Sequence, residues 1–241
     1  MPFRILLACL AGLAFAPCAS ADSAAPPPNI LFIVVDDLGM MDVGAYNPDS
    51  FYDTPHVDGL AASGMQFERP YVSSPVCSPS RYTFMTGRYP SRVYATDWFV
   101  GTRSGRFLPA ELTDRMPLSE ITLAELLQAE GYTTGFFGKW HLGPSEEYYP
   151  QNQGFDVNQG GHFRGGPYTG NRYFSPFEMP ELEPDSPPGE HLPDRLAREA
   201  AAFIDANRDG PFFACLNFYS VHTPLMGRPD LVEKYEERAA S

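Results

Sequence analysis

The feature that most constrains the fold is a set of apolar segments that end abruptly in polar or charged residues. Residues 29–35 are apolar without alternation and run directly into Asp36-Asp37. Such a segment predicts a strand that is covered on both faces, as in a parallel sheet. Residues 132–137 and 211–219 have the same character and predict two further strands.

Helical patterns separate these strands. Thr122-Leu-Ala-Glu125 is a capping box, which predicts a helix that runs to about Glu130. Residues 193–206 place apolar side chains on one helical face, and a third helix is expected at 231–240. Strands that alternate with helices predict an α/β fold with a mainly parallel central sheet flanked by helices.

Two shorter segments complete this outline. Residues 54–67 contain a short helical pattern that is closed by Gly64. Residues 175–189 are rich in proline and glutamate, which predicts an exposed loop.

The N-terminus has the pattern of a secretory signal. Arg4 precedes an apolar run at 5–15, and Ala19-Ser-Ala21 offers small residues for cleavage. We expect a signal peptide at 1–21, a linker at 22–28, and export to the periplasm or the medium. The run is too short to span a bilayer, so stable membrane insertion is not expected. Cys18 allows a lipoprotein alternative, which Pro17 directly before it does not favour.

The charge of the chain limits its partners. Its formal net charge is -13, with a pI near 4.7. A nucleic-acid-binding protein needs a basic face, so no nucleic acid partner is expected. An anionic substrate would need locally concentrated cations or a metal, because the overall field repels it.

Asp36 and Asp37 are the first candidate site residues. Sites in open α/β sheets gather at the carboxyl ends of strands, and adjacent carboxylates there can reach one hard cation such as Ca²⁺. An aspartate pair is also common in solvated turns, so the pair alone leaves both interpretations open.

Cys77 is the candidate nucleophile. Pro79 favours the first turn of a helix, which places Cys77 at a helix N-terminus, where N–H groups favour an anion and a thiol can be activated. A buried loop cysteine is the alternative. Cys215 is the other cysteine beyond the signal peptide; a bridge to Cys77 is possible, and a buried Cys215 is the preferred interpretation.

Three further residues follow predicted strands. Lys139 and His141 lie in the segment 138–143, and His222 follows the strand at 211–219. A lysine offers charge to an anionic oxygen, and a histidine can hold or move a proton. Taken singly, each is more often structural.

A second set of residues is weaker. Asp97, Trp98 and Arg103 can reach a substrate, and His162 and Arg164 lie in a glycine-rich stretch that either lines a pocket or forms a surface loop. None of them is assigned a role.

Together these segments resemble the type I, formylglycine-dependent sulfatases of the alkaline-phosphatase-like superfamily. Cys77-Ser-Pro-Ser-Arg81 matches the pattern that a formylglycine-generating enzyme requires, and Thr86-Gly-Arg88 matches its usual continuation. Asp36-Asp37, the segment 138–143 and His222 stand in the family's order. The resemblance covers the chain from about residue 29 to its end.

The resemblance implies a role for each site residue. Cys77 would be oxidised to formylglycine, whose hydrate attacks sulfur. Calcium would be held by Asp36, Asp37 and Cys77. Arg81 would stabilise the hydrate, Lys139 would contact the sulfate, and His141 would contact the formylglycine hydroxyl. His222 would face the sulfate or the leaving-group oxygen.

The implied function is a sulfuric ester hydrolase that releases sulfate from a sulfated carbohydrate or an aryl sulfate. One hydroxyl of the hydrate attacks sulfur and the alcohol leaves; the second hydroxyl then loses a proton and expels sulfate. A formylglycine-dependent phosphonate or phosphate ester hydrolase is the first alternative. A non-catalytic sulfatase remnant is the second.

Sulfatases of this type are longer than this chain. Their later part supplies a second metal-ligand pair, an Asp followed by Asn or His, and a second sulfate-binding lysine. Neither is found after His222. We therefore expect residues 29–241 to be the N-terminal portion of a catalytic domain, with a sheet that is incomplete at the C-terminus and with weak or no activity as written.

Overall fold

The structure is a computed structural model that describes residues 26–99, 101, 105–170, 172–179 and 181–241. The expected signal peptide at 1–21 and the first part of the expected linker lie outside these residues. In the described part of the chain, no helix combines the length and the apolar composition needed to cross a membrane.

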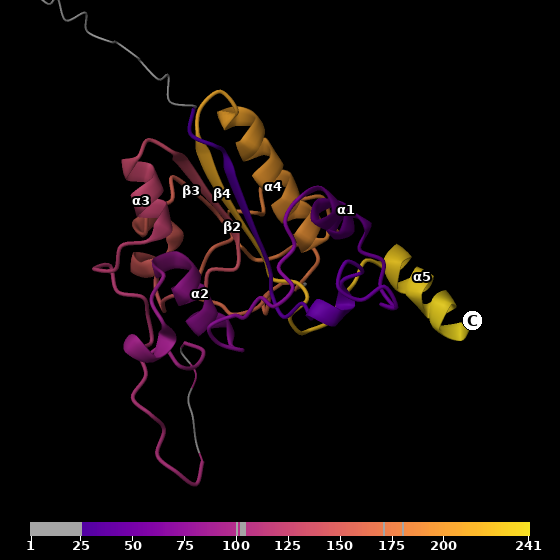
Figure 1. The fold of residues 1–241 in the computed structure, drawn as a ribbon, viewed down its shortest axis with the longest axis horizontal. Helices are drawn as coiled ribbons and strands as arrows, with labels where there is room; N and C mark the ends of the chain where they lie inside the picture. The colour runs from indigo at the N-terminus through magenta and orange to yellow at the C-terminus, as the bar shows by residue number, and fades with distance from the viewer. Residues whose placement is uncertain (1–25, 100, 102–104, 171, 180) are drawn as a thin grey trace, which may run out of the picture.

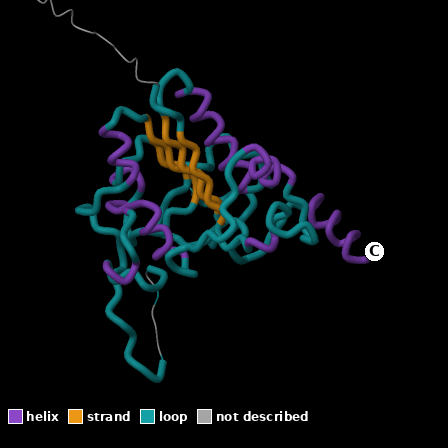
Figure 2. Tube along the Cα trace, in the orientation of Figure 1, coloured by secondary structure: helices purple, strands orange, loops and turns teal. Residues whose placement is uncertain are grey.

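A four-stranded parallel sheet forms the centre of the molecule (Figure 2). Its strands stand in the order β1, β4, β2, β3, with the bounds Ile30–Val35, Phe212–Phe218, Thr133–Gly138 and Val157–Gln159. In register, Val35 lies opposite Phe218, and Gly138 lies opposite Asn217. The carboxyl ends of β1, β4 and β2 therefore meet at one edge of the sheet. The α/β fold with a parallel sheet is confirmed.

Helices cover the sheet on both sides (Figure 1). The helices are α1 (Pro55–Ser63), α2 (Cys77–Thr86), α3 (Leu123–Ala129), α4 (Leu192–Asn207) and α5 (Pro229–Ala240). Short 3-10 turns span Met40–Asp42, Pro90–Arg92, Glu146–Tyr148 and Pro150–Asn152. The predicted capping box is present at the start of α3.

Two hydrophobic clusters hold the helices against the two faces of the sheet. Tyr82 and Met85 of α2 and Ala124 of α3 pack with Phe136 and Phe213 on one face of the sheet. The other cluster joins α4 to the opposite face through Leu196, Ala200, Phe203, Phe137 and Leu216. Alternate side chains of β2 and β4 thus point into different layers, as the period of a strand requires.

The expectation that residues 29–35 are covered on both faces is wrong. Leu31 and Ile33 are 48% and 44% exposed. The reason is positional: β1 is an edge strand, and among the described residues it pairs only with β4.

The expectation of an exposed loop at 175–189 is also wrong in part. Phe177, Met179 and Leu182 are fully buried and belong to the cluster beside α4. The segment is irregular because of its prolines, yet its apolar side chains anchor it to the core.

Candidate active site

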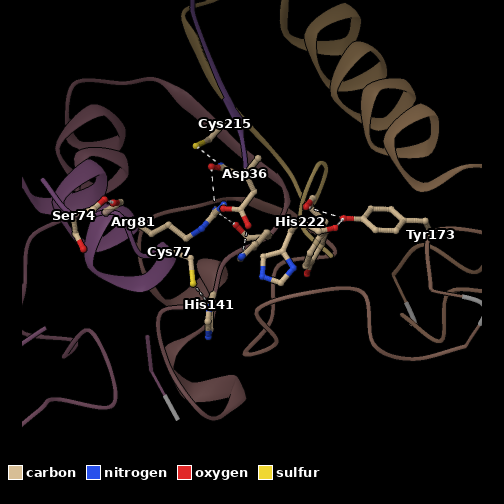
Figure 3. Close-up of polar contacts among 12 residues, drawn as sticks. Asp36, Ser74, Cys77, Arg81, His141, Tyr173, Cys215 and His222 are labelled. Carbon is tan, nitrogen blue, oxygen red and sulfur yellow. Dashed lines mark hydrogen bonds and ion pairs between the residues drawn. The ribbon is translucent and has the colours of Figure 1, made fainter. Parts of the chain in front are cut away.

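The site forms where the carboxyl ends of three parallel strands meet. Asp36 follows β1, Lys139 follows β2, and the turn that leads to His222 follows β4. Cys77 is the first residue of α2, which packs beside this edge (Figure 3). Residues that are far apart in the sequence are therefore brought together by sheet register.

Asp36 lies at the centre of a buried ion cluster. Its Oδ1 accepts a hydrogen bond from the Arg81 guanidinium at 2.8 Å, and its Oδ2 accepts one from the Lys139 ammonium. All three side chains are buried. Burial alone would raise the pKa of Asp36, but the charges of Arg81 and Lys139 hold it below its ordinary value.

Arg81 is held by more than this ion pair. Its guanidinium also donates to the backbone carbonyl of Lys139 and, at 3.4 Å, to the side-chain oxygen of Asn217. Asn217 belongs to β4 and is buried, so strand and helix both constrain the cation.

A close packing of β2 against β4 supports this geometry. Gly138 has a φ of 103°, and a Cβ there would lie 2.0 Å from the carbonyl oxygen of Asn217. Only glycine permits this approach. The neighbouring Lys139 N–H donates to that same carbonyl at 2.8 Å.

Asp37 and His222 lie next to Asp36 at one end of the site. One ligand atom each from Asp36, Asp37 and His222 lie within 4.8 Å of one another. Asp37 is exposed and makes no hydrogen bond or ion pair with the described residues, whereas Asp36 is already shared by two cations. Cys77 is not part of this cluster.

The donor set fits part of a calcium shell. Calcium takes about six to eight oxygen ligands, and two carboxylates at one strand end supply several of them. The oxygens of Asp36 keep a lone pair each after accepting one hydrogen bond. The His222 nitrogen is a poorer ligand for a hard cation than an oxygen.

Cys77 and His141 form a direct pair. The Cys77 Sγ lies 3.3 Å from Nδ1 of His141 (Figure 3). Burial, reinforced by the charges of Lys139 and Arg81, lowers the pKa of His141 to about 3. The imidazole is therefore neutral at physiological pH.

Two site residues have an unusual backbone. Asp37 and His141 have φ values of 60° and 59°, in the left-handed region that non-glycine residues rarely adopt. Such conformations cost about 1–3 kcal/mol each and cluster at functional sites. Both residues are among those that the sequence singled out.

His222 stands on a turn that Tyr173 supports. The hydroxyl of Tyr173 lies 2.8 Å from the carbonyl oxygen of Tyr219 and 2.9 Å from that of His222, and it can donate to either (Figure 3). The Nδ1 of His222 lies 2.7 Å from the carbonyl of Thr223. A carbonyl only accepts, so Nδ1 carries a proton and Nε2 is the nitrogen left for a substrate.

A pocket of about 360 Å³ opens at this edge. It is lined by Asp37, Pro75, Val76, Cys77, Trp98, His141, Gly165, Tyr168 and His222. A smaller pocket of about 210 Å³ is also lined by Cys77 and Asp37, and it includes Asp36 and Arg81. Cys77 thus lines both a pocket that contains His141 and His222 and one that contains Arg81.

The structure brings together every residue that the sequence assigned: Asp36, Asp37, Cys77, Arg81, Lys139, His141 and His222. Trp98 also lines the pocket. Arg103 lies outside the described residues. Cys77 and Cys215 are both free, and Cys215 is fully buried in β4, as preferred from the sequence.

Three contributing residues were missed. Asn217 could have been suspected, because a polar side chain inside the apolar run of β4 needs a buried partner. Tyr168 and Tyr173 follow the glycine-rich stretch and carry no local signal of their own. Their positions depend on how the loop returns over the sheet edge.

Comparisons with known proteins agree with this geometry. Residues 28–241 match the family model described as Sulfatase. The chain is 31% identical to steryl-sulfatase of Rattus norvegicus over 85% of its length and 48% of that protein. It is 42% identical to arylsulfatase A of Homo sapiens over 70% of its length and 29% of that protein.

A solved structure described as Ps i-CgsB in complex with k-i-k-neocarrahexaose is similar as well. It superposes with a TM-score of 0.66 at 31% identity, over 87% of this chain and 49% of that one. The chain thus spans less than half the length of these relatives.

Proposed function

This chain belongs to the sulfatase family, and on that premise we propose that it hydrolyses sulfate esters through a formylglycine formed from Cys77. The observation that supports this most directly is the position of Cys77 at the start of α2, where its Sγ lies 3.3 Å from His141 and the residue lines both pockets. Arg81 and Lys139 supply positive charge on one side of it.

The formation of formylglycine is an oxidation. The Cβ–S bond and one Cβ–H bond of Cys77 break, Cβ forms a carbonyl with an oxygen from water, sulfur leaves as hydrogen sulfide, and an oxidant acting with a formylglycine-generating enzyme takes up two electrons and two protons. Cys77 lines both pockets, so its Cβ faces space that a hydrated aldehyde can occupy.

The charges of the site suit an anionic ester. Asp36 and Asp37 balance Arg81 and Lys139, so the four side chains together are neutral. We propose that Asp36 and Asp37 hold a calcium ion, which, when bound, would draw electron density from the sulfate oxygens. Arg81 and Lys139, held rigidly by Asp36, would orient those oxygens without reorganising.

We propose different roles for His141 and His222. The Nδ1 of His141 lies where it can form a hydrogen bond with a hydroxyl at residue 77. His222 has its Nε2 free of Thr223, and in its protonated form it can give that proton to the departing alkoxide. His141 would thus hold the hydroxyl of residue 77, and His222 would act as the acid for the leaving group.

The substrate we propose is a sulfated carbohydrate or an aryl sulfate. A relative of similar fold has been solved with an oligosaccharide, k-i-k-neocarrahexaose. The apolar run at 5–15 supports export of the protein to the periplasm or the medium, where such polymers occur.

Sulfate release tests this function. The full chain, made together with a formylglycine-generating enzyme and supplied with calcium, is incubated with galactose 6-sulfate, 4-nitrophenyl sulfate and 4-nitrophenyl phosphate. In keeping with the weak or absent activity expected from the sequence, we expect at most slow sulfate release, which should be lost in Cys77→Ala and retained in Cys215→Ala, the matched change at the other described cysteine. Faster hydrolysis of the phosphate would favour the phosphoryl hydrolase. A parent protein that binds sulfate esters without turnover would favour a non-catalytic relative.

A further inference from the structure

Two aromatic side chains at the mouth of the larger pocket take no part in the proposed chemistry. Trp98 and Tyr168 line this pocket together with Cys77, His141 and His222. They remain 43% and 57% exposed, although both are large and mostly apolar. An aromatic ring held at the wall of a hollow gains stabilisation when a ligand covers it.

Each ring lies against a glycine. A Cβ at Gly166 would lie 2.5 Å from Cζ of Tyr168, and a Cβ at Gly101 would lie 2.5 Å from Cη2 of Trp98. Because glycine has no Cβ, one side of each ring packs against the backbone. The rest of each ring stays open to the pocket. A ring that is supported in this way loses little conformational entropy when a ligand binds.

Tyr168 is also close to the proposed acid. Its ring centroid lies 6.1 Å from that of His222, with an interplanar angle of 69°. A ligand ring on Tyr168 would therefore lie on the leaving-group side of the site, while its sulfate reaches Cys77. Asp37 and the His222 ring add polar atoms to the same wall.

We propose that Trp98 and Tyr168 bind the pyranose ring of a sulfated sugar and so determine the substrate class of this site. The inference rests on the proposed function, which it deepens. A pyranose has an apolar C–H face for the aromatic rings and hydroxyl groups at its edge for the Tyr168 hydroxyl. An aryl ring carries no hydroxyl groups at its edge, so it would forgo the hydrogen bond to the Tyr168 hydroxyl.

The size of the pocket agrees with a single sugar unit. Its volume of about 360 Å³ lies near the lower end of the range for small-molecule sites, which is roughly 300–1,000 Å³.

Binding can be measured without turnover. Cys77→Ala removes the proposed nucleophile, so dissociation constants for galactose 6-sulfate and phenyl sulfate can be determined by calorimetry in that background. Tryptophan fluorescence adds a local reporter, because the chain has two tryptophans and the other, Trp140, is 1% exposed. We expect galactose 6-sulfate to shift the emission of Trp98.

Single substitutions then test the two rings. Tyr168→Ala and Trp98→Ala should each weaken binding of galactose 6-sulfate roughly tenfold. Tyr89→Ala is the matched control, since Tyr89 is 58% exposed and does not line the pocket. Gly166→Ala places a Cβ against the Tyr168 ring and displaces it, so this variant should also bind galactose 6-sulfate more weakly.

The outcomes are distinct. Equal affinity of the parent, Tyr168→Ala and Trp98→Ala for galactose 6-sulfate would overturn the proposal, as would absence of binding in the parent. A loss confined to phenyl sulfate would show that the rings bind an aryl group and would overturn the sugar assignment. Binding that depends on both rings, in a protein that releases no sulfate with Cys77 intact, would support this inference while the proposed function fails.

Discussion

At the scale of single residues, the two adjacent aspartates differ in what they stabilise. Asp36 is buried and neutralises both Arg81 and Lys139, whereas Asp37 is exposed. Removing the charge of Asp36 leaves two buried cations beside each other without a counter-charge, and breaking a buried ion pair in this way costs about 3–5 kcal/mol.

We therefore predict that Asp36→Asn lowers the free energy of unfolding by about 3 kcal/mol or more. Asp37→Asn, one residue away, should change it by less than about 1 kcal/mol. Urea denaturation of both variants in the presence of a chelator separates this effect from metal binding. Equal, small losses in both variants would show that the ion cluster does not support the fold.

At the scale of elements, the turn after β4 depends on a residue from a different segment. Tyr173 reaches the carbonyl oxygens of Tyr219 and His222, and the N–H of His222 closes the turn on the carbonyl of Tyr219 at 3.1 Å. The position of the His222 ring is thus set by a hydroxyl 49 residues earlier in the chain.

Tyr173→Phe should loosen this turn. We expect a loss of about 1 kcal/mol in stability, typical for one hydrogen bond, and faster amide exchange at His222. Tyr132→Phe is the control, because Tyr132 also donates to a backbone carbonyl, that of Pro28, far from the turn. If exchange at His222 rises equally in both variants, Tyr173 has no special role in the turn.

The glycine-rich stretch contributes a pH dependence. Burial, with the nearby charge of Arg164, lowers the pKa of His162 to about 4, from an ordinary value of 6.5. Its Nδ1 accepts a hydrogen bond from the N–H of Arg164, and its Nε2 lies 3.5 Å from the Tyr219 hydroxyl. In the unfolded chain, His162 takes up a proton below about pH 6.5, whereas in the folded chain it becomes protonated only at about pH 4.

The free energy of unfolding should therefore fall as pH is lowered from about 6.5 towards 4. His162→Asn, whose side-chain oxygen can still accept from Arg164, should show a shallower decline over that window. Chemical denaturation at pH 7, 6 and 5 measures both slopes. Parallel slopes for parent and variant would contradict the assignment.

Much of this element-level structure was accessible from the sequence. The capping box at Thr122 and the apolar runs before Asp36 and Lys139 are local signals, and parallel strands necessarily bring their carboxyl ends together. The contacts of Tyr173 were not accessible, because its partners come from another segment. Asn217 gave only the signal of a polar residue inside an apolar run, and its partner Arg81 comes from another segment. The burial of Phe177 was missed for the same reason: a proline-rich composition indicates irregular backbone but says nothing of where its side chains pack.

At the scale of the whole molecule, the sheet has an apolar edge. Leu31 and Ile33 of β1 point to the same side and are about half exposed, and among the described residues β1 has one strand neighbour. An exposed apolar edge strand is a template for association, which the net charge of -13 opposes.

We predict that the purified chain self-associates, and more strongly as salt screens its charge. Leu31→Lys combined with Ile33→Lys should reduce this association. Val57→Lys, a change at a side chain of similar exposure on α1, should reduce it less. Light scattering after gel filtration at low and high salt measures the effect. A parent chain that is monomeric at both salt concentrations would contradict the prediction.

The central claim is that residue 77 works as an aldehyde hydrate and not as a thiol. The most direct test is peptide mass spectrometry across Cys77, on protein made with a formylglycine-generating enzyme of proven competence. We predict that this peptide is lighter by about 18 Da than the cysteine form, the difference between a thiol carbon and an aldehyde. An unmodified thiol in that experiment would contradict the account.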